Sequence, residues 1–169
     1  MNNLEPNSWV DNYADYLYRY AQSRVNDSAV AEDLVQETFL SAWKARERFE
    51  GRSSEKTWFF GVNRRVCSEQ RRSGARLGQL AQRLATSAEE PEQVASPAQA
   101  VGEMQSKDNL VEALKGLSPR QREVLHLVFY SGLTLEETAA TLDMTVGSAR
   151  THYHRGKTQL ASMLELDND

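Results

Sequence analysis

The sequence predicts an all-α protein made of two small helical domains joined by a flexible linker. Apolar residues recur at helical spacing along most of the chain, and no stretch shows the alternation that is typical of β-strands. Pro and Gly are sparse, at 4 and 9 of 169 residues. Residues 77–107 differ, because they are rich in Ala, Gln, Ser and Glu and lack aromatic residues. We therefore place the domains at residues 1–76 and 108–169, with the linker at residues 77–107.

The first domain is expected to contain three helices. An apolar stripe from Trp9 to Val25 predicts a first helix of about four turns whose aromatic residues lie in the core. Residues 26–28 form a break with good capping residues, and a second helix is expected over residues 29–48. After a loop at residues 49–54, Ser54 is expected to cap a third helix, which residues 75–86 can extend.

The second and third helices carry unusual polar faces. An acidic face on the second, with Glu32, Asp33, Gln36 and Glu37, fits either a solvated surface or a docking surface for a basic partner helix. The third places Trp58, Phe59 and Phe60 beside Arg and Lys residues. Such a face could bind unstacked bases, with the rings stacking on bases and the cations following the backbone. Equally, the aromatic residues could belong to the core and the Arg and Lys residues could simply be solvated.

Charge is segregated along the chain, although the formal net charge is only −4. Residues 44–83 contain eleven Lys and Arg against four Glu, which gives +7 and leaves −11 for the remainder. Basic surfaces for DNA and acidic surfaces for another partner are therefore both available, and the net charge alone would hide them.

The second domain is expected to hold a helix over residues 110–117 and another that begins at Ser118-Pro119. Ser118 followed by Gln121 is a capping box, Pro suits the first helical position, and Ser131-Gly132 ends the helix. Thr134 and Glu137 form a second capping box for a short helix that ends near Leu142.

A tight turn at Asp143-Met144 and a fresh cap at Thr145 then begin the last helix, which completes a helix-turn-helix pattern. Its apolar face carries Val146, Ala149, Tyr153, Leu160 and Leu164. Its opposite face is basic, and no acidic residue occurs between Met144 and Ser162. Arg and Lys neutralise phosphates, and Arg, Ser and Thr can also bond base edges, so this face indicates DNA binding. The alternative is a solvated basic face on an ordinary bundle helix.

Few other chemistries are indicated. His152 and His154 point to different faces of one helix and have no Cys nearby, so no metal site is expected, and no cofactor is expected. The single Cys67 excludes an internal disulfide, and an inert, partly buried thiol is the simpler interpretation. The chain shows no membrane-spanning run and no signal-peptide core, so a cytoplasmic protein is expected.

The order of these motifs resembles the extracytoplasmic-function (ECF) sigma factors of bacterial RNA polymerase, which belong to the sigma-70 family. Three stretches carry the resemblance: AEDLVQETFLSAW at residues 31–43, FEGRSSEKTW at residues 49–58, and LSPRQREVLHLVFYSGLTLEETAATLDMTVGSARTHYHRGKTQL at residues 117–160. The resemblance covers nearly the whole chain apart from the linker. It implies sigma region 2 in the first domain and sigma region 4 in the second.

The resemblance also implies residue roles and partners. It implies that Asp33, Gln36 and Glu37, supported by Leu34 and Phe39, dock on core RNA polymerase. It implies contacts to the −35 promoter element from the last helix, through Arg150, Thr151, His154, Arg155 and Lys157. It implies −10 contacts from the loop at residues 50–54 and the third helix, through Arg52, Ser53, Trp58, Asn63, Arg64 and Arg65. An anti-sigma factor is an implied partner, and the polymerase-bound protein is expected to be monomeric and not inserted in a membrane.

One stretch departs from the family pattern. After Trp58 the third helix is about one residue shorter than usual, with Glu69 in place of an Asp and Arg71 where an apolar residue is common. The −10 specificity is therefore expected to be unusual.

Other functions remain open at this point. A sigma mimic that sequesters an anti-sigma factor would not need Arg150, Arg155 and Lys157. A helix-turn-helix regulator would dimerise on a palindrome, whereas a sigma factor is a monomer on an asymmetric site. An enzyme is the weakest alternative, because no nucleophile–base pair, phosphate loop or metal cluster is apparent.

Overall fold

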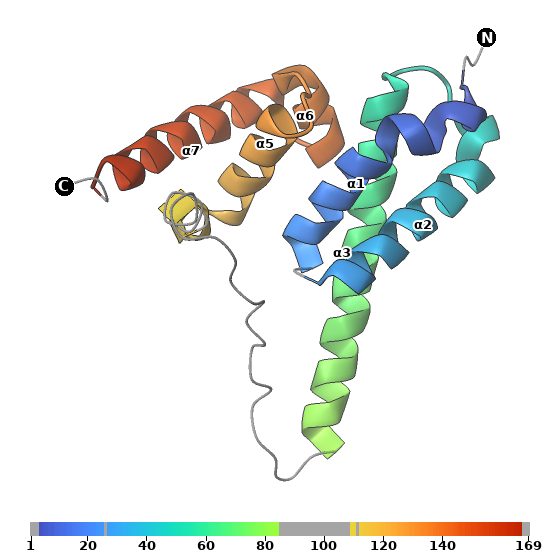
Figure 1. Cartoon of the computed structure of the whole chain (residues 1–169), viewed down its shortest axis with the longest axis horizontal. Coiled ribbons are helices and arrows are strands. Elements are labelled where there is room, and N and C mark those ends of the chain that lie inside the picture. Colours follow the sequence, from blue (N-terminus) through green and yellow to red (C-terminus); the bar gives the residue numbers. More distant parts are fainter. Residues whose placement is uncertain (1–3, 26, 85–108, 111, 167–169) are drawn as a thin grey trace.

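The computed structural model describes residues 4–25, 27–84, 109–110 and 112–166, and every regular element in this part of the chain is helical (Figure 1). The first domain contains a 3-10 turn (Pro6–Ser8), α1 (Trp9–Val25), α2 (Ser28–Ala45), a second 3-10 turn (Arg46–Arg48) and α3 (Glu55–Leu84). The second contains α5 (Pro119–Phe129), α6 (Leu135–Leu142) and α7 (Val146–Leu166), and residues 109–110 and 112–115 are also helical. The predicted all-α fold with two helical domains is confirmed.

The first domain is a three-helix bundle in which α1, α2 and α3 pack on one another. Its core is built from the predicted apolar faces, with Leu17, Ala31 and Phe59 completely buried. The ring of Trp9 packs edge-on against Phe59 at 4.9 Å between centroids. The expectation that the aromatic stripe of the first helix is core is therefore confirmed.

Local capping sets the helix starts as predicted. Asp27 caps α2 by accepting a hydrogen bond from the amide of Val30 at 3.0 Å, and the Ser54 hydroxyl accepts one from the amide of Thr57 at 3.1 Å at the start of α3. Ser118 and Gln121 form both bonds of the predicted capping box at the start of α5. Gly132 follows α5 with a φ of 66°, a backbone conformation that glycine adopts without strain.

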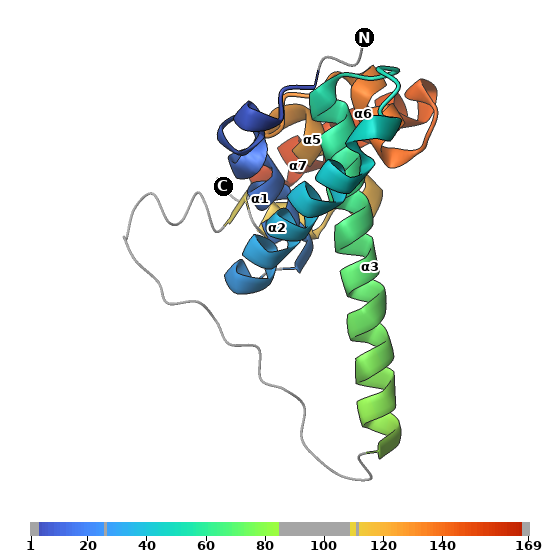
Figure 2. The ribbon, with the colours of Figure 1, turned by 90° about the vertical axis from the view of Figure 1, so that its right-hand side faces the viewer.

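Helix α3 is longer than the other helices and continues to Leu84, eight residues past the predicted domain boundary at residue 76. Its C-terminal part projects away from the rest of the molecule (Figure 2), and Leu77 and Leu80 on it are exposed. The rest of the predicted linker, residues 85–107, lies outside the described residues.

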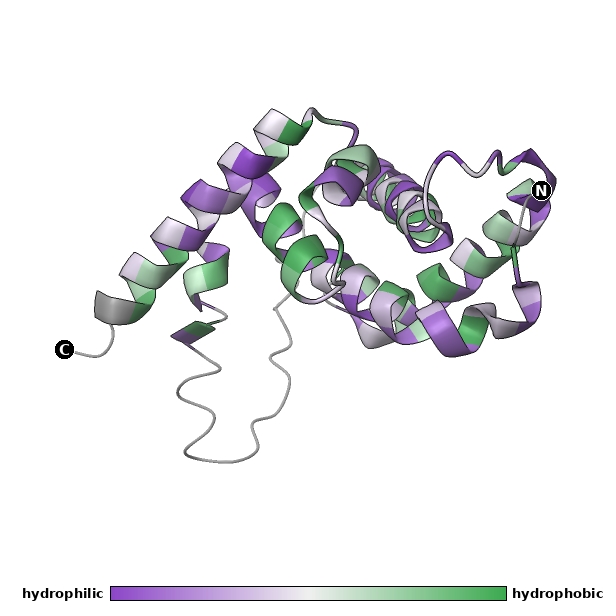
Figure 3. Ribbon diagram, turned by 90° about the horizontal axis from the view of Figure 1, so that it is seen from above, coloured by the Kyte–Doolittle hydropathy of each residue, from purple (hydrophilic) through white to green (hydrophobic). Residues whose placement is uncertain are grey.

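The two domains pack directly against each other, which the sequence did not indicate. Helix α6 contacts α3, and the apolar core continues from α1–α3 into the second domain through Val124, Leu127, Leu133 and Leu142. We call this docking of α5 and α6 onto α1 and α3 the closed arrangement. Figure 3 looks along α3 and shows the second domain beside it, with hydrophilic residues recurring along α7.

Candidate nucleic-acid interface

Helices α6 and α7 form a helix-turn-helix whose turn is fixed by local hydrogen bonds. The Thr134 hydroxyl accepts from the amide of Glu137 at 3.1 Å, and the Glu137 carboxylate accepts from the amide of Thr134 at 2.9 Å. Asp143 ends α6 in the left-handed conformation, with φ 53° and ψ 52°, which reverses the chain. Thr145 then caps α7 by accepting from the amide of Ser148 at 3.1 Å. The predicted turn and both predicted caps are confirmed.

Close packing on one side of α7 determines which side faces outward. Ala149 is completely buried, and Gly156 is also buried, so close to α5 that a Cβ there would lie 3.1 Å from the Leu125 side chain. The ring of Tyr153 stacks on Phe129 at 5.9 Å. Gly156 was not part of the predicted apolar face, because the prediction counted apolar side chains. A glycine instead allows the backbones of two helices to approach closely.

The outward side of α7 carries the five predicted −35 residues, Arg150, Thr151, His154, Arg155 and Lys157, and all five are exposed. Within the described part of the chain, none of the three Arg and Lys residues forms an ion pair with a carboxylate. The ammonium of Lys157 lies 5.8 Å from the ring of Tyr153, and Thr151 donates to the carbonyl of Gly147 at 2.9 Å. This basic face is therefore available to an anionic ligand in the closed arrangement.

The loop at residues 50–54 is held in place by the start of α3. The Glu55 carboxylate accepts hydrogen bonds from the indole of Trp9 at 2.6 Å and the hydroxyl of Tyr13 at 2.8 Å. Burial, together with this bond to Glu55, raises the pKa of Tyr13 to about 12. In the loop, Gly51 has a φ of 70°, the exposed Arg52 pairs with Glu50 at 2.6 Å, and Ser53 is half-buried.

The predicted −10 residues of α3 do not lie on one face. Arg65 is exposed, whereas Arg64 is partly covered at the domain interface. Trp58 is half-buried, with its ring 5.1 Å from Phe49 and 5.3 Å from Phe59, so most of its contacts are to the core. For Trp58, packing against the core is therefore confirmed, and its stacking on an unstacked base stays a prediction.

Asn63 has a packing role, which corrects the expectation that it contacts DNA. Its side chain is completely buried, where its amide donates to the carbonyl of Leu17 at 3.0 Å and its oxygen accepts from the hydroxyl of Thr38 at 3.0 Å. Asn63 therefore links α1, α2 and α3. Its side chain is inaccessible to a ligand while the bundle is folded. Cys67, one turn further along, is also buried, and burial raises its pKa to about 11, so the predicted burial is confirmed and the low reactivity of the thiol stays a prediction.

The acidic face of α2 is a separate surface. Asp33, Gln36 and Glu37 are exposed, while Leu34 is buried and Phe39 packs against Phe59 at 5.6 Å. The latter two thus support the face from below. Gln36 also borders an apolar groove of about 410 Å³, lined by Pro6, Trp9, Val10, Gln36, Phe39, Leu40 and Trp43.

Leu40 and Trp43 were not identified from the sequence, although each is about half exposed. They follow Gln36 by four and seven residues, so they continue its helical face. Two large apolar residues on an otherwise polar face were the signal that could have identified them.

The described residues contain no group of three or more His, Cys, Asp or Glu that could hold a metal ion. Among them, no helix combines the length and the apolar content that crossing a membrane requires.

The fold and these surfaces define a two-domain helical protein with a helix-turn-helix whose last helix presents an exposed basic face. Sequence comparison refines this class. The family model described as Sigma-70 region 2 matches residues 9–77, and the one described as Sigma-70, region 4 matches residues 107–160. The chain belongs to the ECF sigma factors of the sigma-70 family.

Three relatives support this assignment. The chain is 30% identical to the ECF RNA polymerase sigma factor SigX of Bacillus subtilis over 92% of this chain and 81% of SigX. It is 33% identical to BldN of Streptomyces coelicolor and 29% identical to SigE of Mycolicibacterium smegmatis, each over 93% of this chain. It spans only 59% of the length of BldN and 62% of that of SigE.

Solved structures share the fold. The sigma factor RpoE in complex with the anti-sigma factor NepR, from Bartonella quintana, is 28% identical and matches with a TM-score of 0.72 over 95% of this chain and 97% of that chain. CnrH, solved in complex with the cytosolic domain of CnrY, shares the fold with a TM-score of 0.66 at 22% identity over 96% of this chain and 88% of that chain.

Proposed function

We propose that this protein is an alternative sigma factor that binds core RNA polymerase and directs it to promoters with −10 and −35 elements. The observation that carries the proposal is the exposed basic face of α7, free of carboxylate partners among the described residues, in a chain with sigma regions 2 and 4 in order. We expect this activity in the bacterial cytoplasm, where the polymerase works.

The −35 element is proposed to bind α7. In a helix-turn-helix the second helix enters the major groove, and the predicted residues occupy exposed positions of α7. Arg150 is the candidate for bidentate contact to guanine, because Arg is the side chain that most often makes it. Lys157 and Arg155 are the candidates for phosphate contacts.

The −10 element is proposed to bind the loop at residues 50–54 and the exposed edge of α3. Arg52 and Arg65 are exposed there and Ser53 is half-buried, and the half-buried Trp58 is the candidate for stacking on a base. Arg64 becomes part of this surface once the second domain moves away. Opening the duplex costs a few kcal/mol per unstacked step, which the base contacts and the polymerase contacts must offset.

Core polymerase is proposed to bind the face of α2 that carries Asp33, Gln36 and Glu37. This face is acidic and exposed, so it suits a basic helix on the partner. We expect Asp33→Lys or Gln36→Lys to prevent co-purification with core polymerase while the helical content is retained. Asp15→Lys, which reverses the charge of an exposed carboxylate on α1 instead of α2, is the matched control for Asp33→Lys. Normal co-purification of both test variants would remove this assignment.

An anti-sigma factor is proposed as the regulatory partner, as in the solved complex of the Bartonella relative. The sequence identity of 28% to that sigma factor and the shared arrangement of both domains support the inference.

Transcription in vitro from a genomic DNA library, with core polymerase alone and with this protein added, tests the function. We expect new start sites that share an upstream bipartite motif, and we expect none with the Asp33→Lys variant. Core binding without new starts would contradict promoter recognition. The absence of core binding would favour a sigma mimic.

A further inference from the structure

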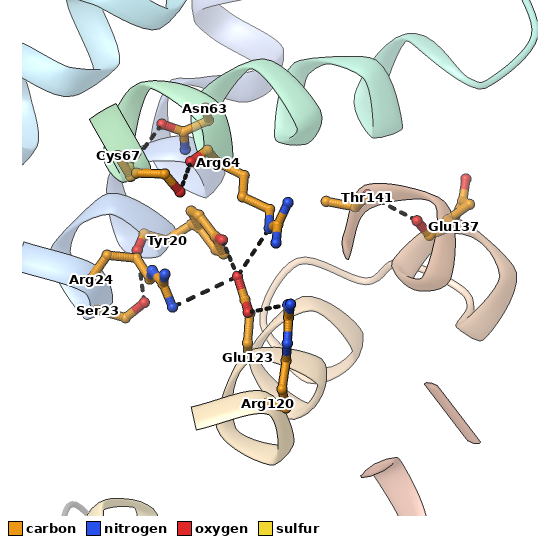
Figure 4. Close-up of polar contacts among 11 residues, drawn as sticks. Tyr20, Ser23, Arg24, Asn63, Arg64, Cys67, Arg120, Glu123, Glu137 and Thr141 are labelled. Carbon is orange, nitrogen blue, oxygen red and sulfur yellow. Dashed lines mark hydrogen bonds and ion pairs between the residues drawn. The ribbon is translucent and has the colours of Figure 1, made fainter. Parts of the chain in front are cut away.

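The closed arrangement is centred on Glu123 of α5, a carboxylate that is almost completely enclosed. Its side chain is 5% exposed and receives a hydrogen bond of 2.6 Å from the hydroxyl of Tyr20. The guanidinium groups of Arg24, Arg64 and Arg120 lie 3.7, 3.5 and 3.3 Å from its oxygens. We call these five residues the Glu123 cluster, and Figure 4 shows their side chains converging on the carboxylate.

Most of the cluster comes from the other domain. Tyr20 and Arg24 lie on α1 and Arg64 lies on α3, whereas only Arg120 shares α5 with Glu123. A buried carboxylate is costly to desolvate unless donors and cations surround it. Three of the four partners of Glu123 are therefore present only while the domains are docked.

Neighbouring contacts add to the same interface. The ring of Tyr20 packs edge-on against His126 at 5.8 Å and against Phe60 at 6.0 Å. At the rim, Ser54 of the predicted −10 loop donates to Glu137 of α6 at 3.2 Å. The interface thus involves two residues of the predicted −10 region, Ser54 and Arg64.

The closed arrangement is too short to span a promoter. Elements centred at −10 and −35 lie about 25 base pairs apart, or about 85 Å along B-DNA at about 3.4 Å per base pair. Helix α6 contacts both α3 and α7, and packed helices lie about 8–10 Å apart, so α7 approaches within roughly 20 Å of α3. The 24 residues from 85 to 108 could span at most roughly 80 Å, which is enough chain for the domains to separate.

We propose that the Glu123 cluster holds the free protein closed. In that form the Glu123 carboxylate pairs with the Arg64 guanidinium group, which would otherwise be free to bind a promoter phosphate. A carboxylate and a phosphate offer the same kind of acceptor to a guanidinium group, so one excludes the other. The proposal rests on the sigma function for its biological meaning, because core polymerase and promoter DNA are the ligands that require the open form. The closure itself is independent of that function.

Single-molecule FRET on the full-length chain tests the closure. Dyes on Ser28→Cys of α2 and Ala161→Cys of α7 occupy exposed sites in the two domains, and the buried Cys67 is protected from labelling. We expect one high-transfer population for the wild type and a shift to low transfer for Glu123→Gln, which removes the charge with little change of shape. Glu112→Gln is the matched control, because Glu112 is an exposed carboxylate of the same domain that pairs only with Lys115 among the described residues.

Tyr20→Phe provides a second variant in case Glu123→Gln unfolds the second domain. It removes the hydroxyl bond to Glu123 and keeps the ring that packs on Phe60, and we expect a smaller shift in the same direction. Unchanged transfer in both folded variants would overturn the proposal.

Binding of core RNA polymerase separates this proposal from the proposed function. Apparent affinity falls in proportion to the open fraction, so a wild type that is open one time in ten would gain about tenfold on opening. We expect Glu123→Gln to bind core polymerase more tightly than both the wild type and Glu112→Gln. If Glu123→Gln shifted the FRET signal but left the affinity for core RNA polymerase unchanged, the proposal that closure competes with polymerase binding would be overturned. A FRET shift with no polymerase binding by any of these proteins would support the closure and overturn the sigma function.

Discussion

Arg64 on α3 and the basic residues of α7 are in opposite states in the same molecule. Arg150, Arg155 and Lys157 on α7 are exposed and have no carboxylate partner among the described residues. On α3, Arg64 is partly covered and pairs with Glu123, whereas Arg65 beside it is exposed. The comparison indicates that the proposed −35 surface is preformed, whereas the proposed −10 surface gains Arg64 only when the domains separate.

Acid is expected to destabilise the folded protein through His126, which lies at the interface between the two domains. Burial lowers the pKa of His126 to about 4, the nearby Arg19 adds to this effect, and Glu123 opposes it. The closed form then binds fewer protons than the unfolded form between about pH 4 and pH 6.5, so its stability falls as pH falls through that window. A shift of this size corresponds to about 3 kcal/mol.

The measurement is the difference in unfolding free energy between the wild type and His126→Gln at pH 7 and at pH 4. Other groups also lose stability in acid, including Glu137, whose pKa is lowered mainly by its bond to the amide of Thr134. The comparison of the two proteins removes that shared contribution. Parallel pH profiles would show that His126 does not cause this loss of stability.

Within α3, Asn63→Ala is expected to separate packing from DNA contact. It leaves the carbonyl of Leu17 and the hydroxyl of Thr38 without their buried partner and opens a small cavity, which costs about 2–3 kcal/mol in unfolding free energy. Arg65 lies two residues further along α3 and is exposed, so Arg65→Ala should change the unfolding free energy by no more than about 0.5 kcal/mol. Urea denaturation measures both. A stable Asn63→Ala that has lost −10 recognition would restore its predicted DNA role.

These two residues also show how far the sequence could predict the site. Caps at Ser54, Ser118, Thr134 and Thr145 depend on neighbours three residues away, so the pattern predicted them correctly. Asn63 lies in a run of polar and basic residues, and its burial depends on α1 and α2, which the run itself does not describe. The family resemblance placed Asn63 on the DNA-contacting helix but could not place it on a face of that helix.

The domain interface was beyond prediction for a related reason. Tyr20 and Glu123 are separated by 103 positions in the sequence, and each has an ordinary explanation on its own helix. Tyr20 belongs to an aromatic stripe, and Glu123 lies in a helix with several charged residues. Only the docking of α5 on α1 brings them together, and helical periodicity contains no information on that docking.

On α7, Arg150→Ala is expected to weaken binding to a −35 duplex by about 1–3 kcal/mol if the guanidinium group reads a base. The loss should be largest for the preferred sequence and small for altered ones, so specificity at one position should relax. Fluorescence anisotropy with a set of single-base variants of the duplex measures this. Equal weakening for every duplex would assign Arg150 to a phosphate instead.

Lys157→Ala is expected to give the smallest effect and the opposite pattern. A lysine that neutralises one phosphate contributes to all sequences alike, so its loss should weaken every duplex by roughly the same amount, about 1 kcal/mol or less at moderate salt, and reduce the salt dependence of log K by about one unit. Lys115→Ala is the matched control, because Lys115 is exposed in the same domain but, unlike Lys157, is paired with a carboxylate, that of Glu112. If the two variants had the same salt slope as the wild type, Lys157 would not lie against the phosphate backbone. The DNA-contacting surface of α7 would then include fewer residues than the exposed basic face. Arg150 and Arg155 would provide its electrostatic attraction to DNA.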